Sequence, residues 1–290
     1  MKKLFVLMGL VLGFLTTVNL SASAQNFSEA DFEGTWDFIY NYSGYSVVLL
    51  GVTTFDATGS LSSGKFLTEG VSFSSGNLSF INTTIGIVSG SLTSITPSVV
   101  IDGISGTMNI TKNRIDGIWT NSLGSSGTFY TLKRPTGAQN FSIEDFEGTW
   151  DFTYYYTGST AAYTGETTFD NNGKIISGAL TTENKTISHG GATFYDWENG
   201  NLFLSISFPD DATYYVFDTI DGTMGSSKET INGTWENSLD YSGTFTGSKQ
   251  ITITDSGGGG GGGGGGPVGP LAVGISTLLS WWKRRKQRQE

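Results

Sequence analysis

The chain has no cysteine and a single histidine among its 290 residues, and only 14% of its residues are charged. Without cysteine there is no disulfide framework, thiol nucleophile, cysteine-based zinc site or lipid-modified cysteine. The one histidine, His189, excludes any site built from several histidines, and nothing indicates a Ser-His-Asp arrangement. We expect His189 to lie in a surface loop, and we expect no cofactor.

Acidic residues outnumber basic ones in the central part of the chain. Residues 25–256 hold 25 acidic and 9 basic side chains, and a region this acidic repels nucleic-acid phosphates and anionic lipid. The excess is concentrated in residues 139–256, with 17 acidic against 4 basic side chains. The sequence therefore excludes nucleic acid as a partner, and the charge is typical of a protein kept soluble outside the cell.

The N-terminus contains the three parts of a secretory signal peptide in order. Lys2 and Lys3 form the positive region, residues 4–18 are apolar, and residues 22–24 (ASA) fit the small-residue cleavage rule. We predict that residues 1–24 are a signal peptide cleaved between Ala24 and Gln25, so that the protein is exported to the cell surface or beyond.

The C-terminus carries a second address signal. Residues 253–266, which include ten consecutive glycines, are predicted to be a flexible linker. The uncharged residues that follow span only about 24 Å as a helix, which is short for a permanent membrane anchor. We therefore predict that residues 267–290 form a short apolar helix with a basic end. The residues expected at the membrane interface are Trp281, Trp282, Lys283, Arg284 and Arg285.

The glycine run, the short apolar helix and the basic cluster together resemble bacterial C-terminal sorting signals of the GlyGly-CTERM type. The resemblance covers residues 257–290 and implies that a rhomboid-type sorting protease removes the tail, so that the membrane is a transient partner. Residues 267–270 (PVGP) depart from the Gly-Ser-rich junction of that family. A plain single-pass anchor is the alternative. A GPI signal normally lacks the terminal basic block.

The central region is a tandem duplication of a whole domain. The segment DFEGTWDF at residues 31–38 recurs identically at residues 145–152, and the segment GTM at residues 106–108 recurs at residues 222–224. The offset between the copies is 114 residues near their start and 116 near their end. We predict two homologous domains, residues 25–136 and 139–252.

Both repeats follow the two-residue period of β-strands. The large side chains Trp36, Phe38, Tyr40 and Tyr42 all fall on one face of an extended segment. About eight strand-like runs per repeat are separated by turn residues. We therefore predict an all-β fold of two tandem antiparallel domains, each a small barrel of ~8 strands, with β-sandwiches as the alternative.

Local signals add two details to this fold. Ser28 and Ser142 are candidate N-caps of a short helical turn before each first strand. Gly59 and Gly173 fall where hairpin turns require a positive φ.

The segment GTW at residues 34–36 and 148–150 resembles the first-strand motif of calycin-like barrels, the lipocalins and avidins. In lipocalins a basic residue near the last strand packs over that tryptophan. The resemblance implies this role for Lys133 or Arg134 in the first repeat and for Lys249 in the second.

The aromatic stripe that recurs in both repeats is the candidate binding surface. It either lines a ligand cavity, with tyrosine hydroxyls as polar contacts, or fills the core. The acids beside each tryptophan, Glu33, Asp37, Glu147 and Asp151, are expected on the solvent side. The ligand-cavity candidates are Trp36, Tyr40, Tyr42, Trp150, Tyr154 and Tyr156.

Acidic residues crowd the second repeat, and oxygen-rich clusters bind Ca²⁺ outside cells. The weak calcium candidates are Asp196, Glu198, Asp210 and Asp211. No EF-hand spacing is present, so no metal site is predicted and a solvated acidic face is the alternative.

These features favour an exported, non-catalytic binding module of unknown ligand. A structural envelope or matrix protein without a ligand is the alternative, and a hydrolase of extracellular polysaccharide that uses paired carboxylates is a more remote one. An interior packed solid around Trp36 and Trp150 would argue against ligand storage.

Overall fold

The computed structural model describes residues 26–95, 100–209 and 215–250. The predicted signal peptide and its cleavage site, the glycine linker, and the C-terminal helix with its interfacial residues lie outside these ranges, as do Asp210 and Asp211. In the part of the chain that is described, no helix is long and apolar enough to span a membrane.

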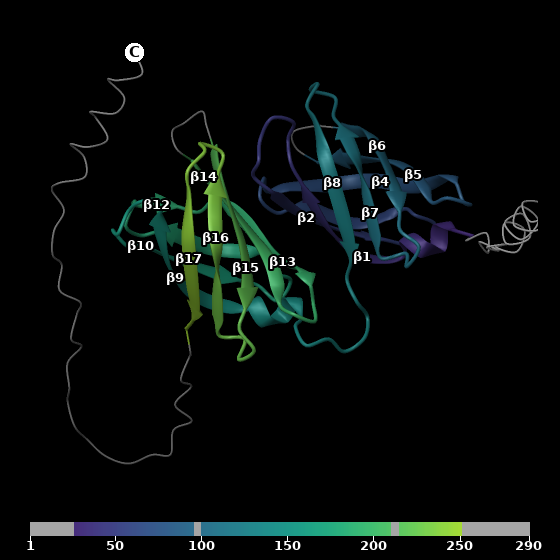
Figure 1. Ribbon diagram of the computed structural model, residues 1–290. Coiled ribbons are helices and arrows are strands. Elements are labelled where there is room, and N and C mark those ends of the chain that lie inside the picture. The colour runs from purple at the N-terminus through teal and green to yellow at the C-terminus, as the bar shows by residue number, and fades with distance from the viewer. Residues whose placement is uncertain (1–25, 96–99, 210–214, 251–290) are drawn as a thin grey trace, which may run out of the picture. The chain divides into compact units, whose positions relative to one another are not determined.

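The first repeat is a closed antiparallel barrel of eight strands in sequential order (Figure 1). The first strand pairs with both the second and the eighth, which closes the sheet on itself and confirms the predicted barrel. The strands are β1 (Gly34–Tyr40), β2 (Leu49–Phe55), β3 (Leu61–Phe66), β4 (Val71–Asn82), β5 (Ile87–Ser94), β6 (Val100–Met108), β7 (Arg114–Thr120) and β8 (Ser126–Lys133).

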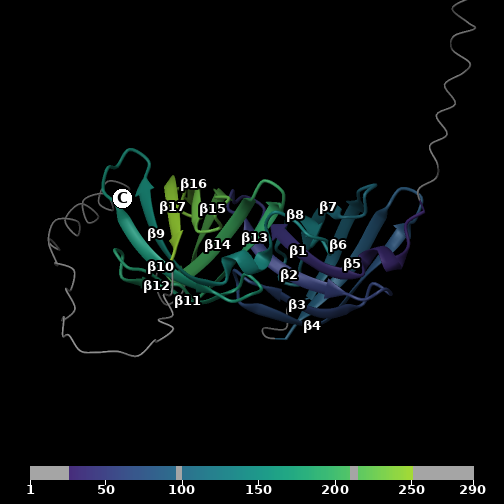
Figure 2. The same ribbon diagram turned by 90° about the horizontal axis from the view of Figure 1, so that it is seen from below.

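The second repeat is a curved sheet of nine strands in the order β12-β11-β10-β9-β17-β16-β15-β14-β13 (Figure 2). Strands β12 and β13 align at offset 114 with the single strand β4, which is interrupted here at residues 187–188. The β-bridge between Lys174 and Gly191 joins the two ends of this sheet. The strands are β9 (Gly148–Tyr156), β10 (Tyr163–Phe169), β11 (Ile175–Leu180), β12 (Lys185–Thr186), β13 (His189–Asp196), β14 (Asn201–Pro209), β15 (Tyr215–Met224), β16 (Thr230–Asn237) and β17 (Ser242–Lys249).

A short 3₁₀ helix precedes each first strand: η1 (Glu29–Phe32) and η2 (Ile143–Phe146). Ser28 and Ser142 are their N-caps, as predicted. Each helix receives the indole of the first-strand tryptophan. Trp36 Nε1 donates to the Phe32 carbonyl at 2.7 Å, and Trp150 Nε1 donates to the Phe146 carbonyl at 2.8 Å. The backbone groups that a short helix leaves free are thus partly satisfied by the buried tryptophan.

A lysine packs over each of these tryptophans, as the calycin resemblance implies. Lys133 Nζ lies 5.5 Å from the centre of the Trp36 ring, and Lys249 Nζ lies 5.8 Å from that of Trp150. We call this end of each repeat, closed by helix, tryptophan and lysine, the tryptophan end.

Arg134 does not pack over Trp36 but forms an ion pair with Asp37. Its guanidinium binds the Asp37 carboxylate at 2.7 Å, and Asp37 is only 1% exposed. The prediction that Asp37 faces solvent is therefore wrong, because the chain leaving β8 lays Arg134 over the outer face of β1. Its counterpart Asp151 is exposed as expected and accepts a hydrogen bond from Gln250 at 2.9 Å. Glu33 and Glu147 are also exposed.

His189 is not a loop residue, since it opens strand β13 and is half-buried. Burial, followed by the charges of Lys65 and Lys174, lowers the pKa of its imidazole. The two glycines after it belong to the strand as well, where a neighbouring strand approaches closely. The two glycines after His189 therefore led to the wrong prediction of a loop where the chain forms a strand.

Glycines make room for tryptophan and backbone at two equivalent positions. A Cβ on Gly127 would lie 1.8 Å from the Asn41 carbonyl, and one on Gly243 would lie 1.6 Å from the Tyr155 carbonyl. Those carbonyls accept the indole N–H of Trp119 and Trp235, each at 3.1 Å. Gly59 and Gly173 both have a φ of +75°, as the predicted turns require.

Candidate functional site

Aromatic and aliphatic side chains fill the interior of both repeats. Between Phe38, Tyr40, Phe66 and their neighbours in the first repeat, about 10 Å³ remains free, and the corresponding space in the second repeat is about 20 Å³. Cavities that enclose small-molecule ligands are typically about 300–1,000 Å³. This packing argues against storage of a lipid or other apolar ligand inside either repeat.

The structure separates the predicted aromatic stripe into two groups. Trp36 and Trp150 are core residues at the tryptophan end and are 1% exposed. The tyrosines lie farther along the same strands, roughly 13 Å away at about 3.3 Å per residue. We call the end of each repeat that holds them the tyrosine end.

In the first repeat both tyrosines bind one glutamate. The hydroxyl of Tyr40 donates to Glu69 Oε2 at 2.7 Å, and the hydroxyl of Tyr42 donates to Glu69 Oε1 at 2.5 Å. Burial, followed by the charge of Glu69, raises the pKa of both phenols. Each glutamate oxygen thus has a phenol donor, and the arrangement is complete without a ligand.

In the second repeat the same glutamate position binds only one tyrosine. Tyr156 donates to Glu183 Oε1 at 2.6 Å, while Glu183 Oε2 lies 3.5 Å from the ammonium of Lys185. The hydroxyl of Tyr154 is buried and has no hydrogen-bond partner. Its pKa is raised by burial and then by the charge of Glu183, whose carboxylate lies near the Tyr154 hydroxyl but not in hydrogen-bond geometry. A buried phenol without a partner costs free energy, so its retention needs an explanation.

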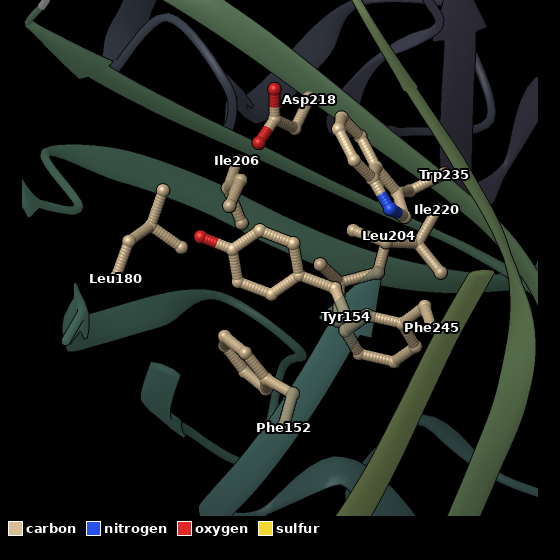
Figure 3. A pocket seen from close by; sticks show the side chains of 9 residues that line it. All are labelled: Phe152, Tyr154, Leu180, Leu204, Ile206, Asp218, Ile220, Trp235 and Phe245. Atoms are coloured by element: carbon tan, nitrogen blue, oxygen red, sulfur yellow. The ribbon is translucent and has the colours of Figure 1, made fainter. Parts of the chain in front are cut away.

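Asp218 contributes a second unpaired oxygen to the same space. It lies on β15 between Ile206 of β14 and Asn237 of β16, and it is 9% exposed. Its Oδ1 is buried without a partner. Figure 3 shows the Asp218 carboxyl and the Tyr154 hydroxyl at the lining of one pocket, with Ile206 beside them (Figure 3).

The surroundings of Asp218 favour its neutral form. Burial and then the charge of Glu183 raise its pKa to about 7, against the opposing effects of a hydrogen bond from Asn237 and the charge of Lys185. A carboxyl poised between its two protonation states near neutral pH is typical of functional sites.

Aromatic rings cluster around Trp235, one of the residues that line this pocket, at the tyrosine end of the second repeat. The Tyr156 ring makes edge contacts with Tyr163, Trp235 and Tyr241 at centroid distances of 4.9, 4.8 and 5.8 Å. Tyr163 aligns with Leu49 of the first repeat, and Tyr241 aligns with Ser125. The second repeat therefore has tyrosines at two positions of this end where the first repeat has leucine and serine.

The sequence offered a signal for these acids that the prediction did not use. Glu69 and Glu183 each follow a stripe tyrosine by 27 residues, and Asp218 aligns with Asp102 at offset 116. An acid that recurs at the same position of both repeats indicates a common role in the two folds, whether it lies in a turn, as Glu69 and Glu183 do, or in a strand, as Asp218 does. The side chain of Asp102 lies outside the described residues, so the comparison of the two ends rests on the tyrosines and glutamates.

The calcium candidates are used locally or lie outside the described ranges. Asp196 accepts hydrogen bonds from the Asn199 backbone and side chain at 3.1 and 2.7 Å, which lower its pKa and hold the turn after β13. Glu198 accepts from Asn140 at 3.1 Å. Among the described residues, no three acidic or histidine side chains are grouped so as to hold a metal ion.

Comparisons with known proteins add little to this picture. No family profile and no curated protein sequence matches the chain. Among solved structures, transferrin binding protein B of Haemophilus parasuis, as a double mutant, aligns over 75% of each chain with 11% identity and a TM-score of 0.24. The same protein from Neisseria meningitidis covers 75% of this chain and 77% of its own, with 9% identity and a TM-score of 0.24.

A third similar structure is a protein of unknown function from the DUF3598 family of Nostoc punctiforme. It covers 78% of this chain and 99% of its own, with 10% identity and a TM-score of 0.23. Scores this low carry no argument about function.

Proposed function

We propose that the protein is an exported, non-catalytic binding protein of the cell surface or its surroundings, and that the tyrosine end of its second repeat holds the ligand. Export is supported by the N-terminal leader and the C-terminal sorting-type tail of the sequence. The observation that carries the binding role is the pair of unpaired buried oxygens, Tyr154 Oη and Asp218 Oδ1, in one aromatic pocket.

The size of the pocket limits the ligand. Its free volume of about 20 Å³ admits only a group of one or two heavy atoms. The ligand is therefore a larger molecule that inserts a small polar group and rests its remainder on the exposed rings, of which Tyr241 is 40% exposed. Aromatic rings with one polar end are well suited to such contacts.

The first repeat has the structural role in this proposal. Its Glu69 is bound by both phenols, and no comparable unpaired carboxylate is found among its described side chains. A protein in which neither repeat binds a ligand is the alternative, and the unpaired Tyr154 and Asp218 oxygens favour the binding role.

The test is a binding screen of the purified full chain against extracellular glycans, peptides and envelope polymers. Tyr163→Leu and Tyr241→Ser, combined, give these positions the residues that the first repeat has there. The matched control is Tyr45→Ser, since Tyr45 is a 56% exposed aromatic of the first repeat.

We expect at least one class of molecule to bind saturably, to lose tenfold or more in affinity to the double variant, and to bind the control normally. Ligands that bind both variants equally, or the absence of saturable binding throughout the screen, would overturn the proposal.

A further inference from the structure

The two unpaired oxygens in the second repeat define the chemistry of the missing group. A phenol both donates and accepts a hydrogen bond, whereas an ionised carboxylate oxygen only accepts. Tyr154 is 7% exposed and Asp218 is 9% exposed, so bulk water serves neither well. A small group with two N–H or O–H donors can therefore serve both oxygens as acceptors.

The charges around the pocket select a cation. The Asp218 carboxyl lines it, and the charges of Glu183 and Lys185 act on Asp218 from nearby. An anion would be repelled by both carboxyls, whereas a charged donor forms hydrogen bonds to a carboxylate about twice as strong as those of a neutral donor.

The composition and size of the pocket exclude a metal ion and bulky cations. Glu183 already serves Tyr156 and Lys185, so one free carboxylate oxygen and one phenol would remain as ligands. Hard cations require six or more oxygens. A volume of about 20 Å³ accepts a group the size of a water molecule but no trimethylated nitrogen.

Resting on the proposed function, we propose that the second repeat binds a primary ammonium group, carried on a larger molecule, between the Asp218 carboxylate and the Tyr154 hydroxyl. An ammonium has three N–H donors and no acceptor. Two of them donate to the Asp218 and Tyr154 oxygens, while the Tyr154 O–H remains on the side of Glu183. Lys185 competes with the ligand, because its own ammonium lies beside Glu183.

The ionisation of Asp218 gives this binding a pH dependence. The groups that face Asp218 are Glu183, Lys185, Asn237 and the phenols of Tyr154 and Tyr156. Binding of a cation needs the carboxylate form, so affinity should rise between pH 6 and 8. An alkylamine stays protonated throughout this range, since its pKa is about 10.

The experiment titrates methylammonium chloride into the ¹⁵N-labelled full chain at constant ionic strength, with NaCl as the balancing salt. The side-chain amide signal of Asn237 reports binding. We expect a saturable shift in the millimolar range, at least tenfold weaker in Asp218→Asn, several-fold weaker in Tyr154→Phe and stronger in Lys185→Met. The matched control Tyr40→Phe, in the first repeat, should bind as the wild type does.

Tetramethylammonium and methanol are run on the unmodified protein, so that the test stands even if a variant fails to fold. Both should leave the Asn237 signal without a saturable shift. The inference is wrong if methylammonium acts no differently from NaCl, if tetramethylammonium binds equally well, or if affinity does not change between pH 6 and 8.

Failure of this inference is distinguishable from failure of the proposed function. If a polymer binds through Tyr163 and Tyr241 but methylammonium does not bind, the proposed function is supported and the ammonium site is wrong. If methylammonium binds saturably but no larger molecule binds through Tyr163 and Tyr241, the ammonium site is supported and the proposed function is wrong.

Discussion

Tyr154 has no partner for its hydroxyl, whereas its counterpart Tyr40 donates to Glu69 at 2.7 Å. The tyrosine hydroxyl at this equivalent position therefore stabilises the first repeat and lowers the stability of the second. We predict that Tyr40→Phe lowers the free energy of unfolding by about 2 kcal/mol, because it removes a hydrogen bond to a charged group. Tyr154→Phe should leave it unchanged or raise it by up to about 1 kcal/mol.

Urea unfolding of both variants measures the difference. Equal destabilisation by the two substitutions would show that Tyr154 is hydrogen-bonded in solution and that the second repeat resembles the first.

Asp218 should make the stability of the second repeat depend on pH. Its pKa of about 7 in the folded protein lies above the ordinary value of 3.8, so the folded state binds the proton more tightly. The contribution is complete below pH 4 and is lost as pH rises from about 4 to about 7, with a slope of up to about 1.4 kcal/mol per pH unit. Urea unfolding between pH 4 and 8 measures it.

Asp218→Asn is the control for that experiment, because it removes the titrating group and keeps the shape. The slope between pH 4 and 7 should flatten in this variant. A slope that survives the substitution would assign the effect to another group.

The lysines over the tryptophans should contribute to stability equally in both repeats. Lys133 Nζ donates to the Asp31 carbonyl and Lys249 Nζ to the Asp145 carbonyl, each at 3.0 Å. We expect Lys133→Ala and Lys249→Ala each to cost about 1–2 kcal/mol, from the lost hydrogen bond and the lost packing of the lysine stem. Thermal unfolding checks this, with Arg114→Ala as the control. Arg114 forms an exposed ion pair with Asp116, which contributes about 0–1 kcal/mol.

Gly127 and Gly243 should not tolerate a side chain. An added Cβ would overlap a backbone carbonyl of the neighbouring strand in each case. We expect Gly127→Ala and Gly243→Ala to destabilise their repeats by about 3 kcal/mol or more, because the strands must separate and the tryptophan hydrogen bonds lengthen. Gly137→Ala is the matched control, since nothing lies within 4 Å of its Cβ position. The three unfolding midpoints give the comparison.

The two address signals predict the ends of the mature chain. Mass spectrometry of the protein from its native host should find an N-terminus at Gln25 and a C-terminus within or before the glycine run at residues 257–266. An intact Glu290 in the membrane fraction would contradict removal of the tail and would indicate a plain anchor.

The sequence by itself determined the architecture. The two-residue period, the turn glycines and the identical segments at residues 31–38 and 145–152 were sufficient to predict two antiparallel β-domains. These signals are local, since each depends on residues near one another in the chain. A basic residue over Trp36 and Trp150 was implied by the resemblance of the GTW segments to calycin-like barrels, and the pairing of each last strand with the first strand of its repeat places Lys133 and Lys249 there.

Only the tertiary structure decided which side chains form a site. Glu183 and Asp218 are 35 residues apart in the sequence, and the curved sheet brings both to the tyrosine end. Whether a carboxylate is paired, as Asp37 is by Arg134, or left without a partner, as at Asp218 Oδ1, depends on contacts across several strands. Composition and hydrophobic period do not specify those contacts. The repeated tyrosines therefore appeared equivalent in the sequence but differ in their hydrogen bonding in the folded protein.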